Sequence, residues 1–155
     1  MTMNLHSRTS RREQGFSLIE VLIALVIMSV GMLGIAGLFV LSMQAGRTSL
    51  FRHNAVLLAG DVADRIRANP RAGIDYTGFG ADSGCVATGI DCNEAAMASH
   101  DIFLWNQQAI DSLPNGNVTI LFNGAIVPPT YTIGVNWNEP GQQMNYTIVI
   151  PVMGL

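Results

Sequence analysis

A single glutamate lies in an otherwise apolar segment near the start of this 155-residue chain. Glu20 closely follows Gly15 and Phe16, and no further charged residue occurs before Arg47. A charged side chain costs roughly 2.5 to 3.5 kcal/mol at the centre of a bilayer, whereas each Leu, Ile, Val or Phe favours insertion by roughly 0.3 to 0.6 kcal/mol. The segment can therefore insert with its carboxylate, but such a group is a candidate functional site that needs a partner. No Lys, Arg or His is within helical reach on its C-terminal side, so we expect the partner to come from another chain or from an amino terminus.

The segment that carries Glu20 is long enough to cross a membrane. Its uncharged part, Val21 to Gly46, has 26 residues, against about 20 needed for a spanning helix and fewer in a secretory signal. Arginines before the segment favour a cytoplasmic N-terminus. We therefore expect a retained membrane helix, with residues 16–46 as its transmembrane part.

The helical pattern continues beyond the apolar segment. Apolar residues at spacings of three and four form one stripe: Phe51, Ala55, Leu58, Val62 and Ile66. Asp61 and Arg65, and likewise Asp64 and Arg67, are spaced to form ion pairs on the helix surface. Asn69 and Pro70 supply a stop, because the residue before a proline disfavours helical geometry. The pattern predicts one helix over residues 16–69, about 80 Å long at 1.5 Å per residue.

Residues 70–155 are expected to form one small globular domain. Arg71 to Asn93 reads as an irregular stretch that contains both cysteines of the chain, Cys85 and Cys92. In an exported domain an even count favours a disulfide, which for so short a loop is worth roughly 2.5 kcal/mol of unfolded-state entropy. A zinc site is the less favoured alternative, since His100 alone does not complete a ligand set.

The remaining chain predicts a second helix followed by strands. We expect the helix to open at Ser99 or His100, to bury Trp105 and to end at Pro114. Asn123 and Gly124 form a strong hairpin signal between strands 118–122 and 125–127. Two further strands are expected: one in which residues 131, 133, 135 and 137 alternate with polar ones, and one over 144–150. Because the sheet and the helix each have one apolar face to bury, the fold class is α+β, with an antiparallel sheet on the second half of the long helix.

Composition argues against nucleic acid binding and catalysis. The chain has no lysine, its formal charge is -3, and clustered cations are what phosphate binding requires. The three histidines, His6, His53 and His100, are scattered, and no phosphate loop, metal-ligand pair or nucleophile elbow occurs. We expect no enzyme activity, no metal and no cofactor.

The N-terminal pattern resembles the class III leader of type IV prepilins and pseudopilins: a short basic leader, then Gly and Phe, then an acid at the fifth mature position. The resemblance implies that a prepilin peptidase cuts between Gly15 and Phe16 and methylates the new amine of Phe16. Residues 1–15 would be the leader peptide. Glu20 would then attract the amino terminus of a neighbouring subunit during assembly, which suits a low dielectric because the amine removes the cost of an isolated carboxylate.

The stretch from Ala63 to Pro70 resembles a helix-end signature of minor pilins of the type IV pilus modification protein family (PilV). Seven of its eight positions match, with Ile66 in place of Met. This resemblance implies a type IV pilin-like fold and a minor pilin that primes pilus assembly at the tip, and thereby contributes to adhesion or twitching motility. Its implied partners are prepilin peptidase, other minor pilins, the major pilin, an adhesin-like tip protein and inner-membrane lipid. The chain would be a single-pass inner-membrane protein with its head, residues 70–155, in the periplasm, and then part of the pilus.

Two other functions remain open from the sequence. A minor pseudopilin of a type II secretion system would use the same leader and helix. A single-pass scaffold or sensor with a periplasmic binding head would keep its leader uncut.

Overall fold

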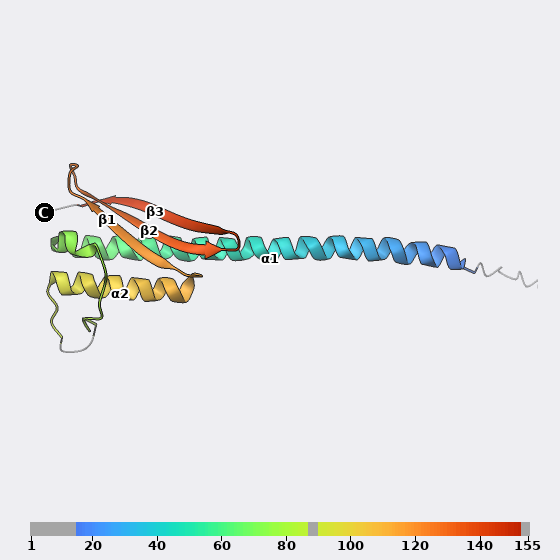
Figure 1. Ribbon diagram of the computed structural model, residues 1–155, viewed down its shortest axis with the longest axis horizontal. Coiled ribbons are helices and arrows are strands. Elements are labelled where there is room, and N and C mark those ends of the chain that lie inside the picture. Colours follow the sequence, from blue (N-terminus) through green and yellow to red (C-terminus); the bar gives the residue numbers. More distant parts are fainter. Residues whose placement is uncertain (1–14, 87–89, 153–155) are drawn as a thin grey trace, which may run out of the picture. The chain divides into compact units, whose positions relative to one another are not determined.

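The computed structural model describes residues 15–86 and 90–152, which form two compact units divided after Met43. Its elements follow the order α1, η1, α2, β1, β2, β3 (Figure 1). The first helix, α1, runs from Leu18 to Ala68 and contributes to both units. The other elements all belong to the second unit.

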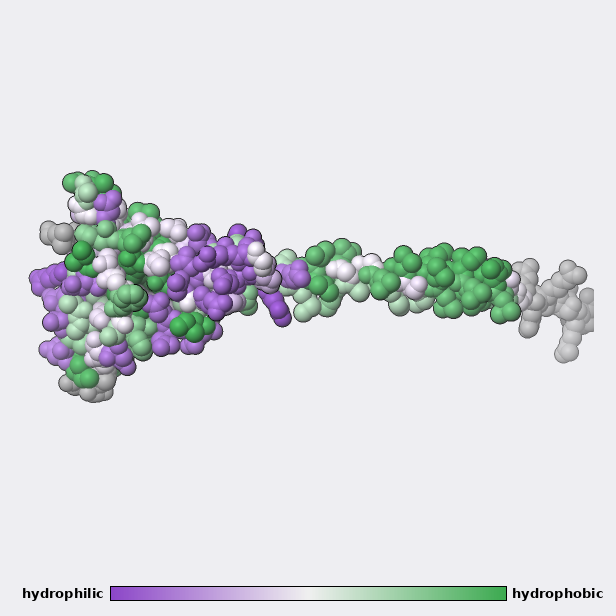
Figure 2. Space-filling model, in the orientation of Figure 1, coloured by the Kyte–Doolittle hydropathy of each residue, from purple (hydrophilic) through white to green (hydrophobic). Residues whose placement is uncertain are grey.

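In the first unit, α1 is exposed throughout and apolar apart from Glu20 and a few small polar residues. It begins two residues after Phe16, and the Ser17 carbonyl accepts hydrogen bonds from the N–H groups of Glu20 and Val21. Figure 2 shows an almost continuous hydrophobic surface over this part of the helix. It is long and apolar enough to cross a membrane.

In the second unit, the predicted stripe of α1 forms part of the core. Ala55, Leu58, Val62 and Ile66 are each at most 4% exposed, and Phe51 packs at the margin. The helix ends at Ala68, immediately before the predicted stop. A short 3-10 helix, η1 (Pro70–Tyr76), follows where the sequence predicted irregular chain.

The second helix, α2 (Glu94–Ser112), starts earlier than predicted. The expected start at Ser99 or His100 is wrong because Asn93 is the N-cap: its side chain accepts a hydrogen bond from the Ala96 N–H at 2.8 Å. Capping by Asn satisfies an N–H that would otherwise lack a partner. The predicted face is correct, since α2 buries Trp105 at 1% exposure against the core.

The sheet has three antiparallel strands in the order β1-β2-β3: Asn117–Asn123, Thr130–Glu139 and Gln142–Pro151. The alternation predicted for β2 is confirmed, because Tyr131, Ile133, Val135 and Trp137 are all at most 2% exposed. Figure 1 shows the sheet lying along the part of α1 that belongs to this unit. The α+β class with an antiparallel sheet packed on the long helix is therefore confirmed.

The expected hairpin at Asn123 and Gly124 is wrong. Asn123 pairs with Thr130, so the turn is a six-residue loop, and residues 125–127 are not a strand. Pro128 and Pro129 have no N–H to donate to a ladder. The Asn123 side chain instead accepts a hydrogen bond from the Ala125 N–H at 3.0 Å, which closes a local turn.

Candidate functional site

The predicted cleavage and assembly residues lie together at the start of the described chain. Gly15, Phe16 and Ser17 are exposed and have no regular secondary structure, and Phe16 is 82% exposed. The peptide bond between Gly15 and Phe16 is therefore accessible to another protein. Glu20 follows in the first turn of α1, where the positive end of the helix dipole favours a carboxylate.

Glu20 has no cationic partner in the ion pairs of the part of the chain that the structure describes. Its neighbours on the exposed surface of the helix are apolar: Phe16, Val21, Ala24, Leu25 and Met28. A carboxylate on an apolar surface interacts strongly with any cation that is brought against it out of water. Glu20 is therefore a candidate site for a cation from another chain.

A second polar cluster joins the helix-end signature of α1 to α2. Arg65 Nη1 lies 3.0 Å from Asp101 Oδ1, and the hydroxyl of Tyr76 donates to Asp101 Oδ2 at 3.1 Å. Asp101 is buried at 4% exposure. Burial raises the pKa of Tyr76 above its ordinary value, and the adjacent Asp101 charge raises it further, whereas a hydrogen bond from Asn69 lowers it. The Tyr76 hydroxyl therefore stays protonated and supports the carboxylate.

The last turns of α1 and the residue that follows the helix make further connections to α2. Trp105 Nε1 donates to Asp61 Oδ2 at 2.9 Å, and Asp61 also pairs with Arg65. Asn69 Nδ2 donates to the Glu94 carbonyl at 2.9 Å. The polar residues at the end of α1 thus fix the position of α2, which is a structural role rather than a reactive one.

These cross-helix partners were not predicted. Helical spacing predicts the pairs Asp61–Arg65 and Asp64–Arg67, and the structure contains both. Helical spacing does not connect Arg65 with Asp101, which is 36 positions away. The only sequence signal was an acid one turn before the buried Trp105 of α2.

The two cysteines form the expected disulfide, with their Cα atoms 5.7 Å apart. Neither thiol of the pair is therefore free to bind zinc. His100 lies in the second turn of α2 at 2% exposure, with Nδ1 3.2 Å from Asp82 Oδ1 but without hydrogen-bond geometry. Cys85 and His100 belong to the contacts that residues 81–85 make with α2.

Glu139, at the end of β2, connects the sheet to the start of the second unit. Its carboxylate accepts hydrogen bonds from the Thr48 hydroxyl and from Trp137 Nε1. These bonds, and the nearby charge of Arg52, lower the pKa of Glu139. The open groove beside it is bordered by residues 44–51 of α1, Pro114, Asn115 and the β2–β3 turn.

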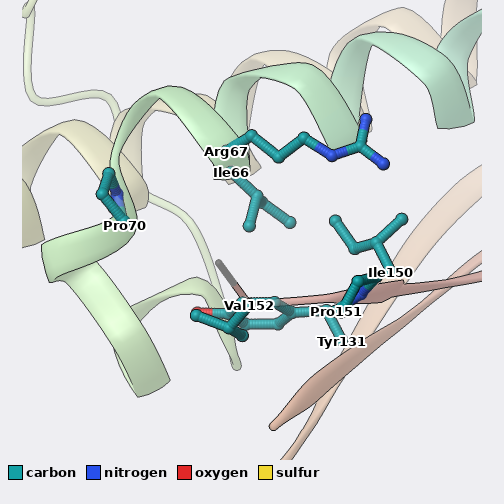
Figure 3. Close-up of a pocket in the computed structure, with 7 residues that line it drawn as sticks. All are labelled: Ile66, Arg67, Pro70, Tyr131, Ile150, Pro151 and Val152. Atoms are coloured by element: carbon teal, nitrogen blue, oxygen red, sulfur yellow. The ribbon is translucent and has the colours of Figure 1, made fainter. Parts of the chain in front are cut away.

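A small cavity lies between the end of α1 and the end of β3 (Figure 3). In Figure 3 Ile66 points toward Tyr131 and Ile150, while the Arg67 side chain extends along the helix and away from the cavity. Its volume is about 120 Å³, below the roughly 300 to 1,000 Å³ of small-molecule sites.

These features define a class: an α+β protein with an exposed apolar N-terminal helix, one carboxylate in its first turn and an antiparallel sheet packed on its second half. Comparison with family models gives two adjacent matches: the prokaryotic N-terminal methylation motif over residues 10–36, and Type IV pilin Tt1218 over residues 37–103. The chain is a type IV pilin with a class III prepilin leader. No curated protein and no solved structure matches it.

Proposed function

We propose that the chain is a minor pilin, a non-catalytic subunit that is anchored in the inner membrane, processed there and then incorporated into a type IV pilus. Prepilin peptidase cuts between Gly15 and Phe16 and methylates the Phe16 amine. The Glu20 carboxylate then pairs with the amino terminus of a neighbouring subunit. The head, residues 70–155, lies in the periplasm before assembly.

One observation supports this proposal: Glu20 lies on an exposed, apolar stretch of α1, with no cation paired to it among residues 15–86 and 90–152. A carboxylate transferred into lipid without a partner costs several kcal/mol. An amine from a second subunit removes that cost only when the two helices are in register. The pairing therefore makes correct register a condition of assembly.

A minor role at the pilus tip is supported by the helix-end stretch from Ala63 to Pro70, which resembles the PilV family. In this chain Arg65 and Asn69 of that stretch hold α2 in place. The resemblance implies contacts with other minor pilins, the major pilin and an adhesin-like tip protein. The subunit would thereby contribute to assembly priming, and so to adhesion or twitching motility.

The experiment that tests this proposal is purification of sheared pili from cells that express a tagged full-length chain. A minor pilin is recovered with the pili at low abundance. Recovery with a type II secretion complex instead would identify a pseudopilin. Retention of the whole population in the inner membrane, with the leader uncut, would identify a scaffold or sensor.

A further inference from the structure

The sheet has two edge strands, β1 and β3, and they differ in how they are covered. Asn106 of α2 accepts a hydrogen bond from the Val118 N–H of β1 at 3.1 Å through its side-chain oxygen. Figure 1 shows β3 at the opposite edge of the sheet from β1. The edge of β1 is therefore partly satisfied by the protein itself.

The two-residue turn between β2 and β3 fixes which backbone groups of β3 point outward. Glu139 and Gln142 pair directly across Pro140 and Gly141, so they form a hydrogen-bonded pair, and such pairs alternate along an antiparallel ladder. The same alternation applies to the ladder between β2 and β1. It predicts that the Val118 N–H points away from β2, and the hydrogen bond from this N–H to Asn106 confirms it. On β3 the outward N–H and C=O groups belong to Gln143, Asn145, Thr147 and Val149.

These outward groups form an open edge. In the described chain, the backbone bonds outside the sheet and helices do not include any of the four residues, and all four are exposed. Natural edge strands are usually blunted by lysines, prolines or bulges. β3 has no charged residue over its 10 positions, no bulge in its register, and a proline only at its last position, Pro151.

The apolar face of β3 is also incompletely covered. Met144, Tyr146 and Ile148 are only half-buried. Their partners on β2, which are Trp137, Val135 and Ile133 in the same order, are 1%, 0% and 0% exposed. The difference arises because β2 has a strand on both sides and β3 has one.

An exposed apolar surface of α1 lies beside the edge of β3. The end of α1 lies beside β3, since Ile66 and Arg67 line the same cavity as Ile150 (Figure 3). Val56 and Gly60 lie on the same helical row as Arg67. Val56 is 43% exposed, and the space next to the Gly60 Cα is open.

We propose that β3 accepts an extended segment of a different polypeptide of the pilus as a fourth strand of the sheet. Backbone groups of Gln143, Asn145, Thr147 and Val149 supply the hydrogen bonds, as in other cases of strand addition. Every second side chain of the added strand is apolar and covers Met144, Tyr146, Ile148 and the row of Val56 and Gly60. The added strand is at least seven residues long, because Gln143 to Val149 covers seven positions of β3.

A second copy of this chain does not fit the edge of β3. This conclusion rests on the proposed function, because it requires the helices of both copies to be anchored in one membrane. Antiparallel pairing of β3 with β3 would reverse the direction of α1 in one copy. Parallel pairing about a twofold axis would turn one sheet over. It would then place polar Asn145 and Thr147, rather than an apolar side chain, next to Tyr146.

The test uses site-specific photocrosslinking in cells that make pili and express the full-length chain. A benzophenone amino acid replaces Gln143, Asn145 or Thr147 in turn. Leu121, which is 67% exposed on β1, is the control position. Adducts from the membrane and pilus fractions are mapped by mass spectrometry.

The proposal predicts that the three β3 positions label one segment of a different polypeptide, with the labelled residue moving by two for each step of two along β3. Leu121 labels no such series. Adducts that are absent, that scatter over unrelated segments or that join two copies of this chain would overturn the proposal. The fraction of the chain recovered in sheared pili is measured separately. Absence from pili would indicate that the proposed function is wrong, whereas presence in pili without the adducts would indicate that strand addition is wrong.

A backbone variant tests the hydrogen bonds themselves. Thr147→Pro removes an outward N–H and leaves the ladder with β2 intact, whereas Thr147→Ala keeps the N–H as a matched control. The proline is expected to reduce the adduct yield from position 145 by about fivefold, the effect of about one backbone hydrogen bond. The alanine variant should keep its yield. Equal yields from both variants, with unchanged melting temperatures in micelles, would contradict pairing at this edge.

Discussion

Arg65 of α1 and Asp101 of α2 form an ion pair with very unequal exposure. The atoms Nη1 and Oδ1 are 3.0 Å apart, and the side chain of Asp101 is 5% exposed whereas that of Arg65 is 45% exposed. A buried carboxylate loses its hydration and depends on its partner, while the guanidinium can return to water. The carboxylate is therefore the vulnerable member of the pair.

Arg65→Ala should destabilise the second unit by about 2 kcal/mol, because it leaves Asp101 buried without its cation. Arg67→Ala is the matched control: its pair with Asp64 is exposed on both sides and should change stability by less than about 0.5 kcal/mol. Thermal unfolding of the full chain in micelles, followed by tryptophan near-ultraviolet circular dichroism, measures both. Equal effects of the two substitutions would contradict this role of Asp101.

Gly116, between α2 and β1, packs against the end of α2 with no room for a side chain. A Cβ atom there would lie 2.2 Å from the Ala109 carbonyl oxygen. Gly116→Ala should therefore lower stability by about 1 to 3 kcal/mol through forced overpacking. Gly46→Ala, in α1 with open space around it, should instead stabilise by about 0.5 to 1 kcal/mol. Chemical denaturation measures the free energy of unfolding of both variants. An unchanged free energy of unfolding for Gly116→Ala would show that the turn is loosely packed and would contradict the prediction.

Elements with a clear period were predictable from the sequence, and contacts between elements were not. The buried stripe from Phe51 to Ile66 follows the helical period of 3.6 residues, and the alternation of β2 follows the strand period of two. The buried face of each element can therefore be predicted from its own residues. The Asn123–Gly124 signal predicts too short a turn, because Pro128 and Pro129 have no N–H to donate to the ladder. The Arg65–Asp101 pair depends on how α2 packs on α1, and no local pattern specifies that packing.

Acid should weaken the contact between Glu139 and the start of the second unit. The pKa of Glu139 is lowered by its hydrogen bonds from Thr48 and Trp137, so its contribution is present above the unfolded-state pKa and is lost as the pH falls through the folded-state pKa. The melting temperature should therefore fall as the pH drops below about 4.5, the ordinary value for Glu. Glu139→Gln should show a smaller acid-dependent fall. An identical pH profile in the two proteins would show that Glu139 contributes nothing.

Glu20→Ala should leave membrane insertion intact and impair incorporation into pili. Insertion is unaffected because removing a charge from an apolar segment lowers its cost in the bilayer. Incorporation falls because the amine of the neighbouring subunit loses its partner. Ser29→Ala is the control, since the Ser29 hydroxyl only donates to the Val26 carbonyl of its own helix. Immunoblots of membrane and sheared-pilus fractions check the effect, and normal pilus levels of Glu20→Ala would contradict the assembly role.

The most direct test of the account is the mass of the N-terminal peptide of the protein recovered from cells with active prepilin peptidase. We predict a peptide that begins at Phe16 and carries one methyl group on its amine, which is the cation that the Glu20 carboxylate of a neighbour requires. Recovery of the protein with Met1 still in place, while other prepilins in the same cells are processed, would contradict it.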